Sequence, residues 1–470
     1  MLARTDDYVV TLHRQNAIYC MTKRKLFLPL LMCASAAAGQ DVWTVERCMQ
    51  YAVEHNHSVR IQELSLDNLR AERLGAVGAF LPSASGSLSG QYNFGRAIDP
   101  ETNTYTNVST FYSGYGLSAS LPVFDGLRRL HDFRTARANE LMGRSQLVAE
   151  RHRIALRVYE SYADVLYCRG AVEMMRQKAD QSRSLLRQTE VMREVGKKAE
   201  ADVAQVRAQL AADELELTRQ QNQLDQAMLR LREDMGLEGD GQFSEKNGQL
   251  IIGDGQFLAE DSAARRGNEP SYMIHSQLNP SLPELEAARR AVDVAQHSYR
   301  AARSGFMPQL SLGAGISTTY YKTLHTPGAT PFGQQFRQNA GEYVYASLSI
   351  PIFDRLRNIT TLRRRRNDVL IARERFYEKQ QELRRLQNET ELERRACLSE
   401  LEQTARRLEA DSLALSLARR QYEVGLSTPL DVQTRAAQLL ESQAQMLRSR
   451  LTLRIKEKLL RYYQGEPPIE

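Results

Sequence analysis

One short motif occurs twice in the chain, 229 residues apart. The copies cover residues 117–125 and 346–354, and each alternates small polar with apolar residues before it ends in proline, an aliphatic residue, phenylalanine and aspartate. A period of two predicts a β-strand with one apolar and one polar face. The proline is expected to end the strand because it has no N–H to donate, and the aspartate is placed to cap the following helix. The residues of this strand-to-helix motif are Pro122, Phe124, Asp125, Pro351, Phe353 and Asp354.

The repeat extends well beyond this motif. Upstream, the sequence of residues 80–82 is echoed at 306–308, and downstream Val195-Gly196 is echoed by Val424-Gly425 at the same offset of 229. Self-similarity at a fixed offset indicates a duplicated unit. Each unit is predicted to contain a helix, two strands joined by a loop, and two long helices joined by a glycine-containing turn.

The boundaries of the units follow from the repeat. The first unit is predicted to cover residues 40–240 and the second residues 281–465, with residues 241–280 as a linker that carries no recognisable chemistry. The strands are expected at residues 82–95, 112–122, 308–321 and 342–351. The helices are expected at residues 44–78, 127–194, 201–235, 356–423 and 429–463, with turns near 195–200 and 424–429.

The polar face of the predicted strands consists mostly of Ser, Gly, Thr and Asn, with few charged residues. Small neutral groups suit a crowded or water-filled interior, whereas an aliphatic face with terminal tyrosines suits lipid and its interface. About ten residues per strand is the length that a tilted membrane strand needs. A packed soluble sheet stays open as the alternative. Four strands cannot close a barrel and an open edge is not viable in lipid, so membrane strands predict an oligomer; three copies supply twelve strands.

The long helical segments make up most of the chain. Residues 127–194 contain no proline, and at ~1.5 Å per residue they form a helix of roughly 100 Å. The partner segments carry apolar stripes at near-heptad spacing, which predict coiled-coil packing between antiparallel neighbours. Helices of this length form a rod, a bundle or a tube.

The N-terminal segment resembles a targeting signal. Lys23, Arg24 and Lys25 precede a short apolar run that is followed by small residues, which is the pattern of a secretory signal peptide. Residues 1–39 are therefore predicted to be an upstream extension and signal peptide, with translation starting at Met21. Met32 is too large for a usual lipobox before Cys33, and lipidation of that cysteine stays open.

The composition argues against several classes of function. Removing residues 1–39 takes away five basic and two acidic side chains from 63 and 57, which leaves a net charge of +3, too small to favour nucleic acid as a partner. No phosphate-binding loop, nucleophile elbow or paired-carboxylate constellation is found. His55 and His57 do not share a helix face, which argues against a metal site. The sequence therefore predicts no enzyme, no cofactor and no nucleic-acid binding.

Taken together, the signal peptide, the duplicated strand pairs and the paired Val-Gly turns resemble the TolC-like outer membrane factor family, over residues 42–463. The resemblance implies an α+β membrane protein of mostly long helices, whose homotrimer has a twelve-stranded barrel in the outer membrane of a Gram-negative bacterium and a helical tunnel in the periplasm. Such proteins are exit channels of tripartite efflux pumps or type I secretion systems. They work with an inner membrane transporter through a periplasmic adaptor protein. The exported substrate and the pump class stay open.

The resemblance also implies two sites. The turns that dock the adaptor match Val195, Gly196, Lys197, Val424, Gly425 and Leu426. The gate at the periplasmic end matches Asp202, Tyr422 and Asp431. Ser427 and Thr434 depart from the family pattern, so the contacts that close the gate are expected to differ. The glycines as plain helix C-caps, and the aspartates as acids favoured at helix N-termini, are equally good local explanations.

Two other classes of function are weighed against the channel. A soluble periplasmic coiled-coil adaptor or scaffold should have one helical hairpin flanked by compact β domains, whereas this sequence predicts two hairpins and long amphipathic strands. A secreted hydrolase with a helical lid needs a catalytic constellation, and the sequence contains none that we recognise.

Overall fold

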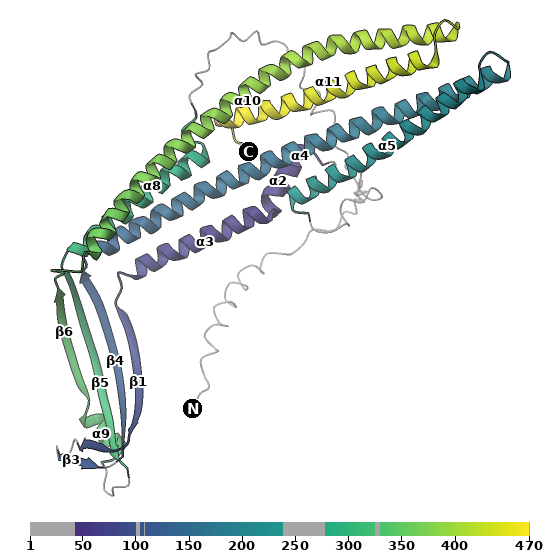
Figure 1. Ribbon diagram of the computed structural model, residues 1–470. Helices are drawn as coiled ribbons and strands as arrows, with labels where there is room; N and C mark the ends of the chain where they lie inside the picture. Colours follow the sequence, from purple (N-terminus) through teal and green to yellow (C-terminus); the bar gives the residue numbers. More distant parts are fainter. Residues whose placement is uncertain (1–42, 100–103, 108, 238–277, 325–329, 470) are drawn as a thin grey trace, which may run out of the picture.

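The computed structural model describes residues 43–99, 104–107, 109–237, 278–324 and 330–469. The described chain is elongated, with a bundle of long helices at one end and a curved β-sheet at the other (Figure 1). The predicted signal peptide and nearly all of the predicted linker lie outside the described residues. Among the residues that are described, no helix is both long enough and apolar enough to cross a membrane.

The helices repeat with the period seen in the sequence. Helices α4 and α10 each contain 67 residues, α5 and α11 each contain 36, and both pairs are separated by 229 positions. The helices are α2 (Val45–His55), α3 (His57–Gly78), α4 (Arg128–Glu194), α5 (Glu200–Met235), α8 (Pro283–Arg303), α10 (Arg357–Glu423) and α11 (Pro429–Gln464). The predicted duplication is therefore confirmed in the fold.

The first helix of the chain is broken, so its prediction as one helix over residues 44–78 is wrong. Asn56 has extended backbone angles and separates α2 from α3. Its side chain accepts a hydrogen bond from the Ser58 N–H at 2.8 Å and donates one to the Asp234 carbonyl, also at 2.8 Å. Asparagine favours such local bonds over a continuous helix, and here it also fastens the start of α3 to the end of α5.

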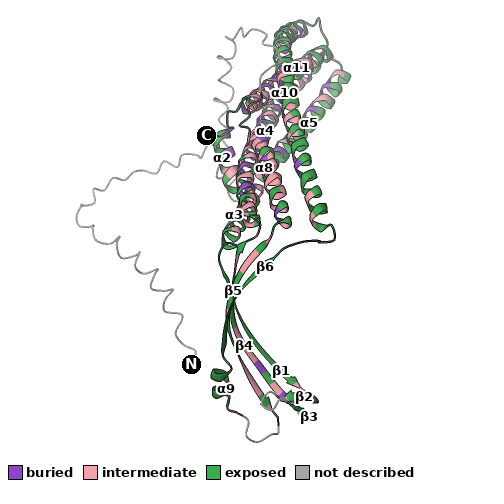
Figure 2. Ribbon diagram, turned by 90° about the vertical axis from the view of Figure 1, so that its left-hand side faces the viewer, coloured by how far each residue is buried: buried purple, intermediate pink, exposed green. Residues whose placement is uncertain are grey.

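Four strands form one antiparallel sheet in the order β1-β4-β5-β6. They are β1 (Ser83–Asn93), β4 (Thr110–Phe124), β5 (Gln309–Thr323) and β6 (Gly341–Ser349). The register places Leu117 opposite Ile316, and it places Ser118 opposite Gly315. Apolar and small polar residues therefore occupy separate faces, as the alternation predicts. In the isolated chain most of the sheet is exposed on both faces (Figure 2).

The prediction that the motif proline ends its strand holds for one copy and fails for the other. Strand β6 stops at Ser349, before Pro351. Strand β4 continues through Pro122, which lies opposite Ser311, and the register shifts between Pro122 and Phe124. Proline is tolerated at such an irregularity because the ladder hydrogen bond that it cannot make is already missing.

The two loops of the sheet contain elements that the sequence did not predict. Strands β2 (Arg96–Asp99) and β3 (Thr104–Asn107) form a hairpin in the first loop, and helix α9 (Phe332–Gln338) lies in the second. Strand β6 begins opposite Ser317, so the end of β5 has no partner strand on that side. The Gln335 side-chain amide accepts from the Tyr321 N–H at 3.0 Å and donates to the Tyr321 carbonyl at 2.8 Å. A side chain thus takes the place of a strand at this edge.

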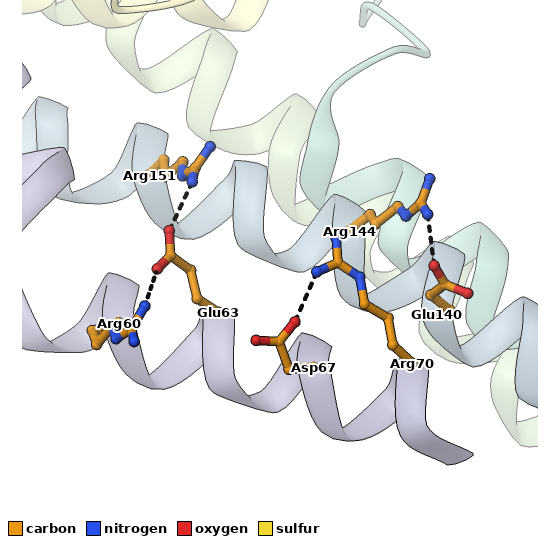
Figure 3. Close-up of polar contacts among 7 residues, drawn as sticks. All are labelled: Arg60, Glu63, Asp67, Arg70, Glu140, Arg144 and Arg151. Carbon is orange, nitrogen blue, oxygen red and sulfur yellow. Dashed lines mark hydrogen bonds and ion pairs between the residues drawn. The ribbon is translucent and has the colours of Figure 1, made fainter. Parts of the chain in front are cut away.

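Helix α4 is the central element of the helical bundle, because α2, α3, α5, α8 and α11 all pack on it. Its contact with α3 combines buried apolar residues with ion pairs. Glu63 of α3 lies 2.8 Å from Arg151 of α4 and 3.1 Å from Arg60 (Figure 3). The hydrogen bond from Arg151, followed by that from Arg60, lowers the pKa of Glu63 below its usual value. The carboxylate therefore stays charged at neutral pH and ties the two helices together.

The strand-to-helix junctions are built alike in both units. The Asp125 carboxylate accepts from the Arg129 N–H at 3.1 Å, and Asp354 accepts from the Asn358 N–H at 2.7 Å. The motif aspartates therefore bond a first-turn N–H of α4 and α10, as predicted, but from two residues before the N-cap positions, which are Leu127 and Leu356. The Arg129 side chain donates to the Ala79 carbonyl at 3.2 Å, and the Asn358 side chain donates to the Gly305 carbonyl at 2.6 Å. Ala79 and Gly305 directly precede the repeated sequences at 80–82 and 306–308.

Both junctions need two residues with positive φ, and the units meet this need differently. The first uses Gly126 and Leu127, and the second uses Arg355 and Leu356. A Cβ on Gly126 would lie 2.6 Å from the Cβ of Met307, which is far inside van der Waals contact. Glycine is thus required at position 126 by close packing as well as by its backbone angles.

We expect Gly126→Ala to destabilise the folded chain by about 2–4 kcal/mol, from the left-handed backbone and the overpacking together. Differential scanning calorimetry of the detergent-extracted protein measures this as a lower melting temperature. Arg355→Ala is the matched control, because position 355 has the same backbone conformation and already carries a Cβ. Equal melting temperatures for the two variants would contradict the packing argument.

Candidate functional site

The two long helical hairpins end in similar turns, which lie at the end of the bundle opposite the sheet (Figure 1). In the first turn, Gly196 has a φ of +75°, its N–H donates to Arg193 O at 2.9 Å, and the Lys197 N–H donates to Met192 O at 2.9 Å. This pair of bonds is a Schellman motif, in which a left-handed residue satisfies the last helix carbonyls. The glycine therefore has the structural role that the sequence allows for.

The second turn repeats this geometry. Gly425 has a φ of +82°, its N–H donates to Tyr422 O at 3.0 Å, and the Leu426 N–H donates to Gln421 O at 2.8 Å. Apart from each glycine and its neighbours in the chain, no atom of the described residues lies within 4 Å of the position that a Cβ would take on Gly196 or Gly425. The space around both turns is open in the isolated chain.

Apolar side chains project from the turns into solvent. Val195 is 64% exposed in the first turn, and Val424 and Leu426 are 69% and 81% exposed in the second. The first turn has Lys197 where the second has Leu426. Apolar groups gathered at the tip of a long hairpin are a surface suited to binding another protein.

Asp431 closes the N-terminus of α11. Its carboxylate accepts from the Thr428 hydroxyl at 2.7 Å and from the Thr428 N–H at 3.0 Å, and its own N–H donates to Thr428 Oγ1 at 3.2 Å. This is a complete capping box. The hydrogen bond from the Thr428 hydroxyl, then that from its backbone, lowers the pKa of Asp431, so this exposed carboxylate is charged at neutral and mildly acidic pH.

Asp202 makes half of the same arrangement at the start of α5. Its carboxylate accepts from the Ala199 N–H at 3.2 Å, and alanine offers no side chain to complete the box. Both predicted gate aspartates therefore have a local capping role. The two positions that depart from the family pattern also act locally: Ser427 donates to Asp431 at 3.2 Å, and Thr434 donates to the Leu430 carbonyl at 2.8 Å.

Tyr422, the third predicted gate residue, is buried where the two hairpins touch. Its hydroxyl lies 3.3 Å from Thr189 Oγ1 of α4, and the Lys198 ammonium lies 5.1 Å from the centre of its ring. No hydrogen bond or ion pair among the described residues joins Tyr422, Asp202 and Asp431 to one another. Tyr422 is thus brought to the neighbouring hairpin, while the aspartates stay with their own helices.

Sequence reasoning missed the other contacts between the hairpins. Arg419 of α10 donates to the Gln181 side chain of α4 at 2.7 Å, and a groove of about 420 Å³ runs between the hairpins beside it. Lys178 and Asp213 line the groove from the first hairpin, and Tyr422 lines it from the second. Arg419 and Gln181 are 238 positions apart in the sequence, so no local pattern indicates their contact. In the described part of the chain, no group of three or more His, Cys, Asp or Glu residues is arranged to hold a metal ion.

Comparison with known proteins places this geometry in context. The model of the family described as "Outer membrane efflux protein" matches residues 48–237 and 275–466. Among curated proteins, the chain is similar to the alkaline protease secretion protein AprF of Pseudomonas aeruginosa. The two are 23% identical over 342 residues, which are 71% of this chain and 66% of that relative.

Several solved structures share the fold. One set of crystal structures of CusC, described in terms of folding and transmembrane channel formation, aligns with a TM-score of 0.73 and 18% identity over 94% of this chain and 98% of that chain. The outer membrane protein VceC of Vibrio cholerae aligns with a TM-score of 0.70 and 18% identity, over 90% and 96% of the two chains. The CmeC outer membrane channel of Campylobacter jejuni gives 0.72 and 12%, over 95% and 98%.

The capping box at the second turn makes a local prediction. We expect Thr428→Ala to destabilise the start of α11 by about 1 kcal/mol, because a cap of this kind contributes about that much. Hydrogen exchange measured by mass spectrometry should then be roughly fivefold faster over residues 427–433. Ala199→Thr is the converse change in the first turn and should slow exchange over residues 198–204. Unchanged exchange in both variants would show that the boxes contribute nothing to the turns.

Proposed function

Because the chain belongs to the outer membrane efflux protein family, and is an outer membrane channel protein with a periplasmic helical part, we propose that its homotrimer is the exit duct of an export machine. Cargo enters from an inner membrane transporter, to which the duct is joined by a periplasmic adaptor protein. The name of the AprF relative favours type I secretion of a protein as the export class, with efflux of small molecules as the second. The observation that carries the proposal is the free edge at each side of the sheet.

The sheet cannot stand alone in lipid. Strands β1 and β6 are both edge strands, and their residues are exposed or nearly so along their whole length. Unpaired backbone groups are not tolerated in the hydrocarbon region, so each edge needs a partner strand. Pairing β6 of one copy with β1 of the next satisfies both edges, and three copies close a barrel of twelve strands.

The helices support the same assembly. Helix α4 lies between α3 and α8, whereas α10 packs on α8 and α11 without a comparable contact to α3 in the described chain. Although both helices have 67 residues, 18 are buried in α4 and 9 in α10. Helix α4 contacts the first helix of its own unit, α3, and that of the other unit, α8. Helix α10 contacts α8 of its own unit, so the repeat predicts that its second neighbour is α3 of the next copy. The exposed apolar residues Ile61, Leu64 and Leu74 give α3 a surface for that contact.

We assign adaptor docking to the two hairpin turns and gating to the periplasmic end of the bundle. Docking uses the exposed residues Val195, Val424 and Leu426, held in place by the glycine caps. For the gate, three copies of Asp431 around the channel axis form a ring of carboxylates, which attracts cations and repels itself as the end narrows. The soluble adaptor alternative is less well supported, because the described chain has two hairpins and a membrane-type sheet.

Gly425→Trp should stop export and leave the trimer intact. The indole occupies the open space beside the turn, where a docking partner needs close approach, while the contacts between copies lie elsewhere. Export is measured in the native host from the proteins of the culture supernatant and from ethidium accumulation, against a deletion strain. Assembly is measured as the mass of the detergent-extracted protein from the outer membrane fraction.

Gly425→Asn is the matched control, because asparagine tolerates the left-handed conformation and adds little bulk. It should export normally. Normal export by the tryptophan variant would remove the turn from the docking surface. A wild-type protein that is monomeric and soluble without detergent would contradict the channel itself.

Asp431→Asn should lower both the conductance of the isolated channel in planar bilayers and its preference for cations, because the ring then neither attracts cations nor repels itself as the end narrows. The capping role of Asp431 is a confounding factor, so Thr428→Ala, which loses the threonine half of the capping box and keeps the carboxylate, is measured beside it. Equal conductance of the asparagine variant and the wild type excludes Asp431 from the gate. An equal fall in both variants assigns the effect to the cap.

A further inference from the structure

A buried polar pair joins the two helices of the first hairpin. Asp213 of α5 is 2% exposed, and its carboxylate accepts from the Ser182 hydroxyl of α4 at 2.6 Å. Lys178, one turn before Ser182 on α4, lies 2.9 Å from the other carboxylate oxygen, which also accepts from the Gln209 amide at 2.9 Å. The buried charge is thus fully paired by groups from both helices.

The second hairpin contains the same pair with its members exchanged. Adding the repeat offset of 229 to Ser182 and Asp213 gives Asp411 and Ser442. The Ser442 hydroxyl of α11, fully buried, donates to the carboxylate of Asp411 on α10, whose side chain is 19% exposed. The carboxylate has therefore moved to the other helix, and the hydrogen bond between the helices is kept.

The positively charged partner is kept as well. Position 178 corresponds to Arg407, which lies 3.5 Å from Asp411 one turn away on the same helix. Position 209 corresponds to Gln438, whose carbonyl accepts from Ser442 at 3.1 Å. A cation at this position can reach the carboxylate across the hairpin, as in the first unit, or along its own helix, as in the second.

This unit is sensitive to the alignment of the two helices. Sliding one helix by a single turn moves it by ~5.4 Å, which separates the pair and leaves the buried Asp213 carboxylate without its partners. Neighbouring ion pairs across the hairpin are less demanding: Arg183 and Glu214 are both about half exposed, so water can replace their contact. The buried pair therefore discriminates between alignments far more than the exposed one does.

We propose that the serine–aspartate–cation unit fixes the alignment of the two helices in each hairpin and so positions the turn; we call this unit the register lock. Its carboxylate can be on either helix of the hairpin. In both hairpins, the member of the pair on the first helix lies 14 residues before the glycine of the turn, and the member on the second helix lies 17 residues after it. At ~1.5 Å per residue this is roughly 21 Å from the tip, so one lock sets the height of each turn in the same way.

The double exchange S182D/D213S in the first hairpin tests the lock, because it recreates the chemistry of the second hairpin at the equivalent positions. Opening of the turn is measured on the purified full-length protein as the initial rate of tryptic cleavage after Lys197, identified by mass spectrometry. Cleavage after Arg420 in the unchanged second hairpin is the internal reference.

We expect S182D, with two carboxylates side by side, and D213S, with none, to be cleaved about tenfold faster than the wild type. The double variant should return to within about threefold.

A control exchange beside the exposed Arg183–Glu214 pair, S184D/E214S, moves a carboxylate between the same helices and leaves the residues of the lock unchanged. Its single variants should change cleavage by less than about twofold, with no recovery in the double variant. The mirror exchange D411S/S442D, read after Arg420, tests the second hairpin independently.

Cleavage of either double variant as fast as its worse single variant overturns the proposal, as do single variants that behave like the wild type. Should S182D not fold, the folded yield becomes the readout. Recovery of that yield in the double variant then supports the lock, and failure to recover contradicts it.

Discussion

A strand that faces lipid must have every backbone group paired, and this requirement determines how the rest of the chain is arranged. One copy supplies a four-stranded sheet with two free edges, too few strands to close. Within the copy, β4 and β6 continue into α4 and α10 through the junctions at Asp125 and Asp354, and α3 and α8 precede β1 and β5, so every strand of the sheet is joined to the helical bundle at one end. The same junctions that direct the helices away from the sheet thus align the strands for closure with other copies.

Because the chain is a repeat, its internal contacts are a guide to the contacts between copies. Inside the chain, α4 and the second unit meet through α8 and through the approach of Gly126 to Met307. The equivalent surface of α10 is open, and position 355 carries arginine where position 126 has glycine. In the proposed trimer, we therefore expect the boundary between copies to resemble the internal boundary in its backbone and to differ from it in its side chains.

Much of this architecture could be predicted from the sequence, because it rests on periodic and repeated patterns. The strand faces, the long helices and the turns at Gly196 and Gly425 each leave a local signal. The break at Asn56 left only a weak signal, the asparagine itself, because it also depends on the Asp234 carbonyl on a distant helix. Helix α9 was missed for a similar reason: Gln335 has a defined role only beside the uncovered edge of β5. Likewise, the contact of Tyr422 with Thr189 depends on the packing of two hairpins, which residue spacing does not encode.

The two hairpins show which properties a repeat retains as its halves diverge. Ser182 and Asp213 have exchanged identities with their equivalents, yet a serine–aspartate hydrogen bond joins the helices in both halves, buried in the first and partly exposed in the second. At the tips the reverse holds: the backbone of the turns is retained, and the side chains differ, with Lys197 facing solvent in one and Leu426 in the other. Packing constrains the geometry inside both hairpins, whereas the exposed side chains at the tips are under no such constraint within the described chain. In the proposed trimer, six turns of equal height therefore alternate between two chemistries, and a partner that contacts all six must present an alternating surface to match them.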